Sequence, residues 1–311
     1  MPRIVFMGTP DFALPALERL AAGPYDLVAV YTQPDRPSGR GRQLAETPVK
    51  RWALEHKVDV HTPLSFRKPD VLEELRALRP DVLVVAAYGR LLPPPVLAVA
   101  PRGAVNIHPS LLPRYRGPSP VTAAILVGDV RTGATIMLLD EGMDSGPILS
   151  QIEMPIGAED TTGTLTAKLA LAGADLLMQT LPRWLDGQIT PRPQDAARAI
   201  ICAKVEKEHG RIDWSRQALE IERAVRAYQP WPGAYTQWQG KQIKVLRATA
   251  ATGSGVPGSV SIVDAKPEKA IAIATGSGTL FVAEVQLEGK RPMRASEFLA
   301  GHQAIVGATL G

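Results

Sequence analysis

The residues best suited to chemistry are an amide and an imidazole placed two positions apart in an apolar stretch. Asn106 and His108 lie in "GAVNIH", residues 103 to 108, which runs directly into "PSLLPRYRG". Side chains two residues apart in a strand point to the same face, so a strand here places both groups side by side. A single histidine at a strand end is more often structural than catalytic, so the pair needs a third group to define a site.

A carboxylate in the later stretch "LLDEGMDSGPIL", residues 138 to 149, is the candidate for that third group. Asp140, Glu141 and Asp144 lie there in a loop bracketed by glycines, and any of them could approach the imidazole. A carboxylate, an imidazole and an amide together suit acyl transfer. The sequence has no serine elbow and no histidine spacing suited to a metal, which favours direct transfer without a covalent enzyme intermediate or a metal ion.

The elements that position these groups follow a βαβ rhythm from Arg3 to about Leu185, where short apolar runs alternate with amphipathic stretches. We predict an α/β fold with a Rossmann-like, mostly parallel sheet, whose ligands bind beyond the carboxyl ends of the strands. Only Gly8 remains of a dinucleotide fingerprint, so a nicotinamide cofactor is excluded. Thr9 and Pro10 are typical of a helix N-cap and first helical position.

The composition and the hydrophobic pattern of the chain change after the helix expected at residues 161 to 185. A proline-rich stretch, "DGQITPRPQDAARAI", indicates a linker, and glycine-punctuated strands with a "QGK" hairpin turn follow one helix. We predict a catalytic domain at 1–189, a linker at 190–206 and a small C-terminal β-barrel like the oligonucleotide-binding fold at 207–311.

Composition is that of a soluble globular protein, with 45% hydrophobic and 21% charged residues. No apolar run approaches the roughly 20 residues that cross a bilayer, and the chain enters a strand at once, so we expect no signal peptide and a cytoplasmic location. Lys and Arg balance Asp and Glu, 21 of each, before residue 204, so the net charge of +4 lies entirely beyond it. Such a surplus marks either an ordinary soluble surface or one that meets phosphates. Nothing indicates an obligate oligomer, and we expect a monomer.

"NIHPSLLPRYRG" together with "LDEGMDSGPIL" resembles the signature of the folate-dependent formyltransferases. The similarity extends through "KEHGRIDWS" at Lys207 and "YQPWPGAYT" at Tyr228. It implies that Asn106, His108 and Asp144 are catalytic, that 10-formyltetrahydrofolate is the formyl donor, and that the acceptor is the α-amino group of methionyl initiator tRNA, for translation initiation. The chemistry agrees, because Asn106 and a His108 N–H can stabilise a tetrahedral oxyanion while Asp144 orients His108 and helps move the proton of the amine.

The same resemblance implies a folate site on three loops. Leucines would hold the pterin while irregular backbone pairs with its polar edge. The alternative for either leucine loop taken alone is a proline-stopped turn that packs the core. The implied contacts are Tyr88, Gly89, Arg90, Leu91, Leu92, Ser110, Leu111, Leu112, Pro113, Asp140, Glu141 and Gly142.

A long basic loop, residues 33 to 51, is the candidate for tRNA binding. It is too long for an ordinary βα connection, and long loops are usually functional or disordered; a solvated charged surface is the alternative. The resemblance implies that it contacts the acceptor end of tRNA through Arg36, Arg40 and Arg42, with Arg42 as the principal contact. The C-terminal barrel would hold tRNA phosphates, and we expect Trp214, Trp231 and Trp238 to pack within it.

Three other functions compete with this one. An amino-sugar formyltransferase shares the catalytic motifs but does not require an arginine-rich loop. A formyltetrahydrofolate hydrolase would use water as acceptor, which the C-terminal resemblance disfavours. A noncatalytic RNA-binding protein predicts RNA affinity that ignores folate. No DNA or membrane partner is expected.

Overall fold

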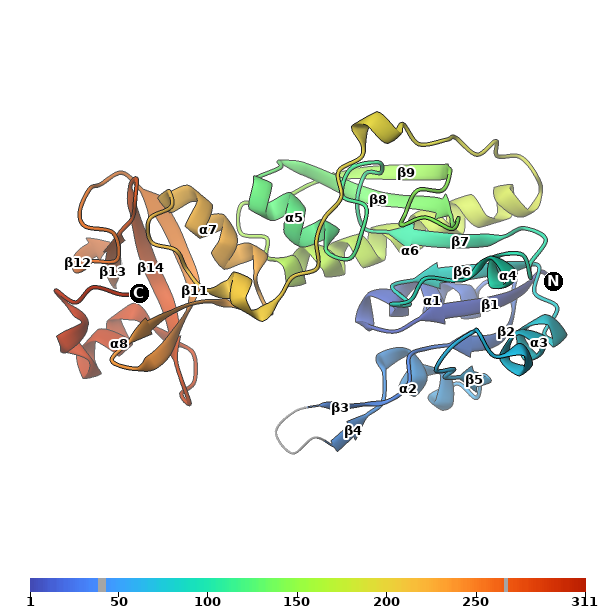
Figure 1. Cartoon of the computed structure of the whole chain (residues 1–311), viewed down its shortest axis with the longest axis horizontal. Helices are drawn as coiled ribbons and strands as arrows, with labels where there is room; N and C mark the ends of the chain where they lie inside the picture. The colour runs from blue at the N-terminus through green and yellow to red at the C-terminus, as the bar shows by residue number, and fades with distance from the viewer. Residues whose placement is uncertain (39–42, 266–267) are drawn as a thin grey trace. The chain divides into compact units, whose positions relative to one another are not determined.

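The computed structural model describes residues 1–38, 43–265 and 268–311, and divides into two compact units (Figure 1). The N-terminal unit contains Met1–Pro120, Arg131–Pro155 and Thr166–Cys202. The C-terminal unit contains Val121–Val130, Ile156–Leu165 and Ala203–Gly311. Two short segments that precede residue 166 therefore group with the C-terminal unit. The linear boundaries at 189 and 206 stay predictions.

The N-terminal unit is built on a seven-stranded sheet, in the order β5-β2-β1-β6-β7-β8-β9. Every neighbouring pair from β5 to β7 is parallel, whereas β8 runs antiparallel to β7, and β9 antiparallel to β8. The predicted mostly parallel sheet is confirmed. Its strands are β1 (Arg3–Gly8), β2 (Asp26–Tyr31), β5 (Val60–His61), β6 (Val82–Ala86), β7 (Ala104–His108), β8 (Arg131–Leu138) and β9 (Ile148–Pro155).

Helices cover both faces of this sheet, which explains why β6 and β7 are buried along their whole length. Leu75 of α3 and Val96 of α4 share one apolar cluster with Val85 of β6. On the other face, a Cβ added to Gly173 of α6 would lie 2.7 Å from Ile107 Cγ2. The helices are α1 (Leu14–Ala22), α2 (Pro48–Glu55), α3 (Pro69–Ala77), α4 (Pro94–Leu97) and α6 (Thr162–Leu185), with 3-10 turns at Asp11–Ala13 and Ala196–Arg198.

The turn after β1 differs from the prediction. Thr9 does not cap a helix: Pro10 is the N-cap of the 3-10 turn, and α1 begins only at Leu14. The Thr9 hydroxyl instead donates to the Tyr88 carbonyl at 3.0 Å. A tertiary hydrogen bond to the neighbouring strand-end loop has replaced the local cap that the sequence indicated.

The C-terminal unit contains an antiparallel sheet in the order β10-β11-β14-β13-β12, with β15 beside β14. Gln239 and Gly240, both at positive φ, form the predicted hairpin turn between β10 and β11. The strands are β10 (Ala234–Trp238), β11 (Lys241–Ala251), β12 (Val260–Ala265), β13 (Glu268–Ala274), β14 (Thr279–Leu287) and β15 (Met293–Arg294); the helices are α5 (Pro120–Val127), α7 (Ala218–Ala227) and α8 (Ala295–Gly301), with 3-10 turns at Lys207–Gly210 and Gln303–Ile305.

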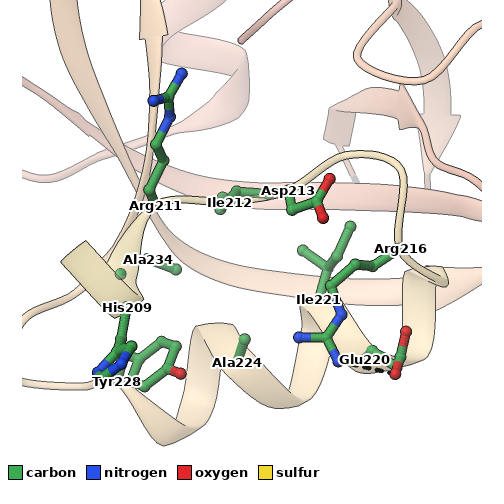
Figure 2. Close-up of a pocket in the computed structure, with 11 residues that line it drawn as sticks. His209, Arg211, Ile212, Asp213, Arg216, Glu220, Ile221, Ala224, Tyr228 and Ala234 are labelled. Atoms are coloured by element: carbon green, nitrogen blue, oxygen red, sulfur yellow. Dashed lines mark hydrogen bonds and ion pairs between the residues drawn. The ribbon is translucent and has the colours of Figure 1, made fainter. Parts of the chain in front are cut away.

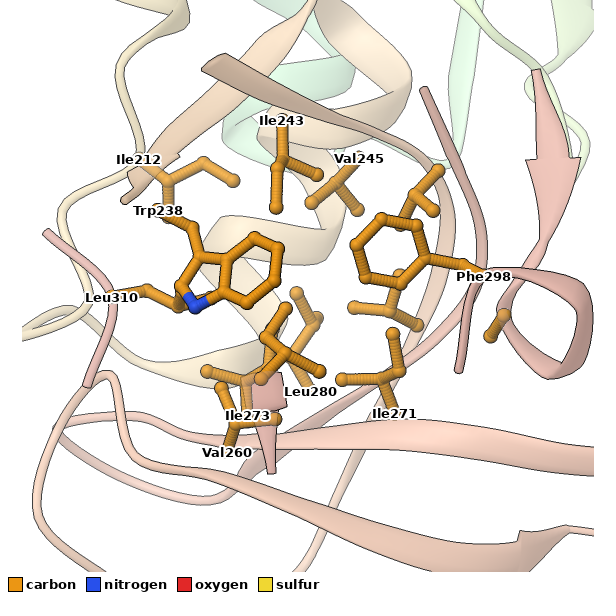
Figure 3. Packing of buried hydrophobic residues seen from close by; sticks show 14 of the residues in the cluster. Ile212, Trp238, Ile243, Val245, Val260, Ile271, Ile273, Leu280, Phe298 and Leu310 are labelled. Atoms are coloured by element: carbon orange, nitrogen blue, oxygen red, sulfur yellow. The ribbon is translucent and has the colours of Figure 1, made fainter. Parts of the chain in front are cut away.

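The last residues of the chain join the two edges of this sheet. The Leu310 amide donates to Gly258 O beside β12, and the Gln237 amide of β10 donates to Gly311 O. The predicted small β-barrel therefore takes the form of an antiparallel sheet whose edges are bridged by the C-terminal tail. Its interior is apolar, with Trp238 and Phe298 in edge-to-face contact among aliphatic side chains (Figure 3).

The predicted packing of the tryptophans holds for two of the three. Trp214 and Trp238 are buried, and the Trp214 indole donates to Thr236 Oγ1 at 3.1 Å. Trp231 is 56% exposed, so the prediction was wrong there. It lies between two prolines, whose turn presents the indole outward rather than into the core.

Candidate active site

Asn106 and His108 project from one face of β7, as the alternation predicts. Their strand is held on both sides, by β6 and by β8, so the backbone beneath them is fixed. Both residues are buried, at 8% and 4% exposure. Two polar side chains are thus built into the apolar face that α3 and α4 cover, where an unused polar group is costly.

The His108 ring has a defined hydrogen-bonding state. Its Nε2 lies 2.9 Å from the Tyr115 carbonyl, which can only accept, so Nε2 carries the hydrogen. Its Nδ1 faces Asp144 Oδ2 at 3.7 Å. Burial lowers the pKa of His108 below 6.5, while Asp144 and the bond to Tyr115 act in the opposite direction. At neutral pH the imidazole is uncharged, with the lone pair of Nδ1 on the side of the carboxylate.

Asp144 reaches this ring by an indirect route. Because β8 is antiparallel to β7, Leu138 pairs with Val105, so the chain leaves β8 near the beginning of β7. The loop then folds back, and the Asp144 carboxylate accepts a hydrogen bond from the Gly117 amide at 2.8 Å. Asp144 adopts a positive φ of 50°, which an aspartate tolerates better than most residues.

The loop after β7 holds both His108 and Asp144 through its backbone. Tyr115 O accepts from His108, and the amide of Gly117 donates to Asp144. Gly117 has φ +109, and a Cβ built there would lie 2.7 Å from Cys202 O. No other residue fits this position without displacing backbone.

The structure places the predicted folate residues on three loops joined by one side chain. Leu139 packs against both the cluster that contains Tyr88 and Leu92 and the cluster that contains Leu112. Among the implied contacts, Leu92 and Leu112 are buried, as in the alternative of core packing, but Leu91 is 70% exposed. The loop from residue 140 to 142 is exposed and is shaped by Asp140 Oδ1, which accepts from the Gly142 amide.

The first of these loops has room for a ligand and a rigid base. A Cβ added to Gly89, at φ +83, would meet no atom within 4 Å. Beneath it, the Tyr88 carbonyl accepts from Gln33 Nε2 at 3.1 Å, and Gln33 Oε1 in turn accepts from Arg90 at 2.9 Å. An open backbone cradle with an exposed leucine beside it suits a flat heteroaromatic group, so the residues present fit a pterin.

The loop that contains Ser110 and Pro113 is tied down rather than open. Ser110 is fully buried and donates to Arg114 O at 2.7 Å. Pro113 O accepts from the Ile200 amide at 3.2 Å, and the Leu112 amide donates to Thr135 Oγ1. These contacts fix the loop whether or not it also touches a ligand.

Sequence reasoning missed several residues that hold the site together. Arg116 and Gln194 are hydrogen-bonded to each other across 78 positions, and the Gln194 amide also contacts the loop that contains Asp144. Cys202 is buried beside Gly117, and its amide donates to Arg116 O. Contacts across this separation leave no local pattern. Only Gly117, a glycine after basic residues in a sharp turn, offered a signal.

The basic loop is partly organised. A two-stranded hairpin, β3 (Arg36–Ser38) and β4 (Gln43–Ala45), forms its base, and Arg36 is exposed on it. Arg40 and Arg42 lie outside the described residues. Lys50 is held by Asp35 at 2.6 Å and Glu46 at 3.1 Å, and these hydrogen bonds raise its pKa. Its charge is therefore already paired within the protein.

The stretch "KEHGRIDWS" lines a small cavity of about 60 Å³ in the C-terminal unit, together with α7 (Figure 2). Arg216 and Glu220 form an ion pair at 2.9 Å on its wall. Among the described residues, no three metal-binding side chains gather in one place. In that same part of the chain, no helix is both long and apolar enough to span a bilayer.

The fold and the site define a group-transfer enzyme on a Rossmann-like sheet, with an amide, a neutral imidazole and a carboxylate at one strand. The Formyl transferase family matches residues 2–181, and the Formyl transferase C-terminal domain matches residues 204–303. This chain belongs to the formyl transferase family. It is a formyl-transferring enzyme, and its family uses 10-formyltetrahydrofolate as donor.

Curated relatives match over nearly the full length. The chain is 50% identical over 304 residues to a protein of Chloroflexus aurantiacus named methionyl-tRNA formyltransferase, covering 97% of each. It is 51% identical over 312 residues to the protein of that name from Roseiflexus sp., covering 99% of this chain and 95% of the relative. Among solved structures, an N-formyltransferase from Helicobacter canadensis, bound to folinic acid and dTDP-3-aminofucose, shares the fold with a TM-score of 0.67 at 18% identity, covering 91% of this chain and 99% of that one.

Proposed function

We propose that this enzyme transfers the formyl group of 10-formyltetrahydrofolate to the α-amino group of methionyl initiator tRNA, in the cytoplasm and as a monomer, for translation initiation. The observation that carries the proposal is the 50% identity to a methionyl-tRNA formyltransferase over 97% of both chains. Such coverage includes the C-terminal domain as well as the catalytic one. Identity at this level along both domains supports the acceptor as well as the formyl chemistry.

The catalytic trio supplies what this reaction needs. The amine nitrogen forms a bond to the formyl carbon, and the bond from that carbon to N10 of the folate breaks. The Asn106 amide donates to the oxygen on which negative charge develops. Neutral His108 accepts the proton of the amine at Nδ1, and the resulting imidazolium lies 3.7 Å from the Asp144 carboxylate, which stabilises its charge. His108 then returns that proton to the departing nitrogen.

This assignment changes one detail of the interpretation from sequence. The Nε2–H of His108 is already donated to the Tyr115 carbonyl, so the neutral ring has no second N–H for an oxyanion. His108 gains a second N–H only after Nδ1 has taken the proton, and that N–H lies on the side of Asp144. Asn106 is therefore the oxyanion donor from the start of the reaction, and His108 is first the base.

An unusually strong base is not required. A free α-amino group has a pKa of about 7.7 to 8.0, so a substantial fraction is already neutral near pH 7. Burial keeps the pKa of His108 low, which leaves the ring neutral and ready to accept a proton. Alignment of the amine and polarisation of the formyl carbonyl supply most of the acceleration.

The donor site is formed by the loops at residues 88–92, 110–113 and 140–142. The open backbone at Gly89 and the exposed Leu91 support pterin binding. Tyr88 is buried at 2% exposure beneath this loop, so it supports the site rather than contacting the ligand through its ring. The Asp140 carboxylate shapes the third loop.

Acceptor recognition rests on two basic features. Arg36, Arg40 and Arg42 of the basic loop sequence contact the acceptor end of tRNA, and Arg36 is exposed on β3. Residues 204–311 contain all of the net positive charge of the chain and contact phosphates of the tRNA body. Neither DNA nor a membrane is a partner.

The test offers four acceptors side by side with 10-formyltetrahydrofolate: methionyl initiator tRNA, methionyl elongator tRNA, an amino-sugar nucleotide and water. Formylation of the initiator tRNA alone, at least 100-fold faster than any other acceptor, supports the proposal. Faster transfer to the sugar or to water contradicts the acceptor but retains the trio. A wild-type protein that binds RNA yet transfers formyl to none of them contradicts the reaction as a whole.

A further inference from the structure

Gln194, which lies outside both strand-end loops of the active site, forms hydrogen bonds with each of them. Its Oε1 accepts from the Nε and Nη2 atoms of Arg116, at 3.0 and 2.9 Å. Its Nε2 donates to Asp144 O at 2.8 Å and to Gly146 O at 2.7 Å. One amide thus connects the loop that bonds His108 to the loop that contains Asp144.

The hydrogen-bonding capacity of this amide is completely used. A side-chain amide offers two acceptor positions and two N–H donors, and Gln194 employs all four. The partners also fix its orientation, because a guanidinium can only donate and a carbonyl can only accept. Neither glutamate, which lacks the donors, nor an apolar residue of the same length can reproduce this set.

Backbone contacts hold Gln194 where it can do this. Arg192 exchanges hydrogen bonds with Ile148 at the start of β9, at 2.8 and 2.9 Å. Ten residues later, the Cys202 amide donates to Arg116 O at 2.8 Å, and the Arg116 amide donates to Ile200 O at 2.8 Å. Residues 192–202, which we name the strap, are therefore attached on both sides of Gln194. The strap lies within the N-terminal unit.

We infer that Gln194 is a positioning residue for formyl transfer, acting through Asp144. Its two donated bonds hold the backbone on either side of Ser145, and the Asp144 side chain then reaches the Gly117 amide at 2.8 Å and the His108 ring at 3.7 Å. Arg116, one residue before Gly117, is the other end of the connection. The distance between the two loops, and with it the approach of carboxylate to imidazole, is set by this amide. The inference rests on the proposed function for its rate measurement only.

The test compares Gln194→Met with the wild type in formyl transfer to methionyl initiator tRNA at saturating donor. We expect kcat to fall about 10- to 100-fold, because a displacement of about 1 Å at a catalytic group can cost 100-fold. KM for the tRNA should stay within twofold. Gln179→Met is the matched control, since Gln179 is exposed on α6 of the same unit and outside the site.

A double-mutant cycle separates positioning from general damage. If Gln194 acts through Asp144, Gln194→Met should change kcat less than twofold in the Asp144→Asn background, measured in single turnovers. A loss in that background as large as in the wild type contradicts the inference. So does a Gln194→Met enzyme with wild-type kcat.

Hydrogen exchange tests the same inference without turnover. Gln194→Met should speed exchange of the Gly117 amide, which is bonded to Asp144, and of amides at 140–146, at least tenfold, whereas Gln179→Met should not. Unchanged exchange at both places overturns the inference even if the wild type is fully active. A wild type that transfers no formyl group, with exchange changed as expected, contradicts only the proposed function.

Discussion

Substitution of Gly117 by alanine perturbs the contact between the loop after β7 and the loop that contains Asp144. Gly117 has φ +109, and its amide donates to Asp144 Oδ2 at 2.8 Å. A Cβ there would lie 2.7 Å from Cys202 O and 3.4 Å from Met143 Sδ. The first contact is with backbone that a hydrogen bond to Arg116 holds in place, so it cannot be relieved by rotating a side chain.

The expected loss of stability has two parts. Holding a non-glycine residue in a sparsely populated backbone region costs about 1–3 kcal/mol. Forcing an extra carbon into a packed site costs about 1–3 kcal/mol more. Gly117→Ala should therefore lower the free energy of unfolding by about 2–6 kcal/mol. A protein in the middle of the ordinary range, about 10 kcal/mol, remains largely folded after such a loss.

The effect on catalysis should exceed that on the population of folded enzyme. Relief of the clash moves the Gly117 amide away from Asp144, and the carboxylate loses the bond that holds it beside His108. A displacement of about 1 Å predicts a kcat about 100-fold lower, which corresponds to about 2.7 kcal/mol of barrier. In the proposed function most tRNA contacts are made by the basic loop at residues 33–51 and by residues 204–311, outside this site, so KM for tRNA should change little.

Urea unfolding and steady-state formyl transfer measure these two quantities, and Gly103→Ala is the control. Gly103 also has positive φ, +71, but a Cβ there meets only Leu138 Cδ2 at 3.7 Å, an ordinary contact. Gly103→Ala should therefore lower the free energy of unfolding only by the cost of the positive φ, without the clash, and should retain kcat. Equal stability and equal kcat in the two variants would refute the role given to the close approach at Gly117.

Other substitutions test the remaining assignments. Asn106→Ala should lower kcat about 100- to 1000-fold, as expected for loss of an oxyanion donor, with unchanged circular dichroism and tRNA affinity; a parallel loss of tRNA binding would contradict the role. His108 has a folded pKa below 6.5, so the unfolded state binds more protons as pH falls through 6.5 and the free energy of unfolding falls with it. His108→Asn should therefore reduce the change of the urea midpoint between pH 7.5 and 5.5. An unchanged dependence of the midpoint on pH would count against the buried neutral ring. Thr47, the N-cap of α2, accepts from the Lys50 amide at 3.0 Å, so Thr47→Ala should cost about 1 kcal/mol in urea unfolding. Arg42→Ala should raise KM for tRNA at least tenfold while folate binding, followed by fluorescence, stays unchanged; unaltered tRNA kinetics would remove Arg42 from the acceptor site.

The placement of Asn106 and His108 could be predicted because a strand repeats every two residues. An apolar run with polar residues at alternate positions leaves one solution, in which both side chains share a face. The parallel sheet followed for the same reason, from runs such as that of β6, buried on both faces. Periodicity also located α6, which begins one residue after the predicted helix start.

Choice among the carboxylates of the β8–β9 loop could not follow from periodicity. The loop begins near the start of β7 and reaches the other end only by folding back, with Asp144 at positive φ. Which carboxylate arrives beside His108 depends on the amide of Gly117, a residue at a left-handed position in another loop. The prediction that Thr9 caps a helix was wrong for a related reason, since its hydroxyl donates to the Tyr88 carbonyl instead of accepting from a local amide.

Composition described the strap correctly as irregular but said nothing of its contacts. Prolines and polar residues disfavour helix and strand because of their own backbone preferences, and the strap has only a 3-10 turn at Ala196–Arg198. Those preferences do not limit what its side chains or its backbone can bind. Arg192, Gln194 and Cys202 each pair with residues at least 44 positions away. A segment without regular structure can therefore set the geometry of an active site as firmly as a strand does, provided that its hydrogen bonds are made to elements that are themselves fixed.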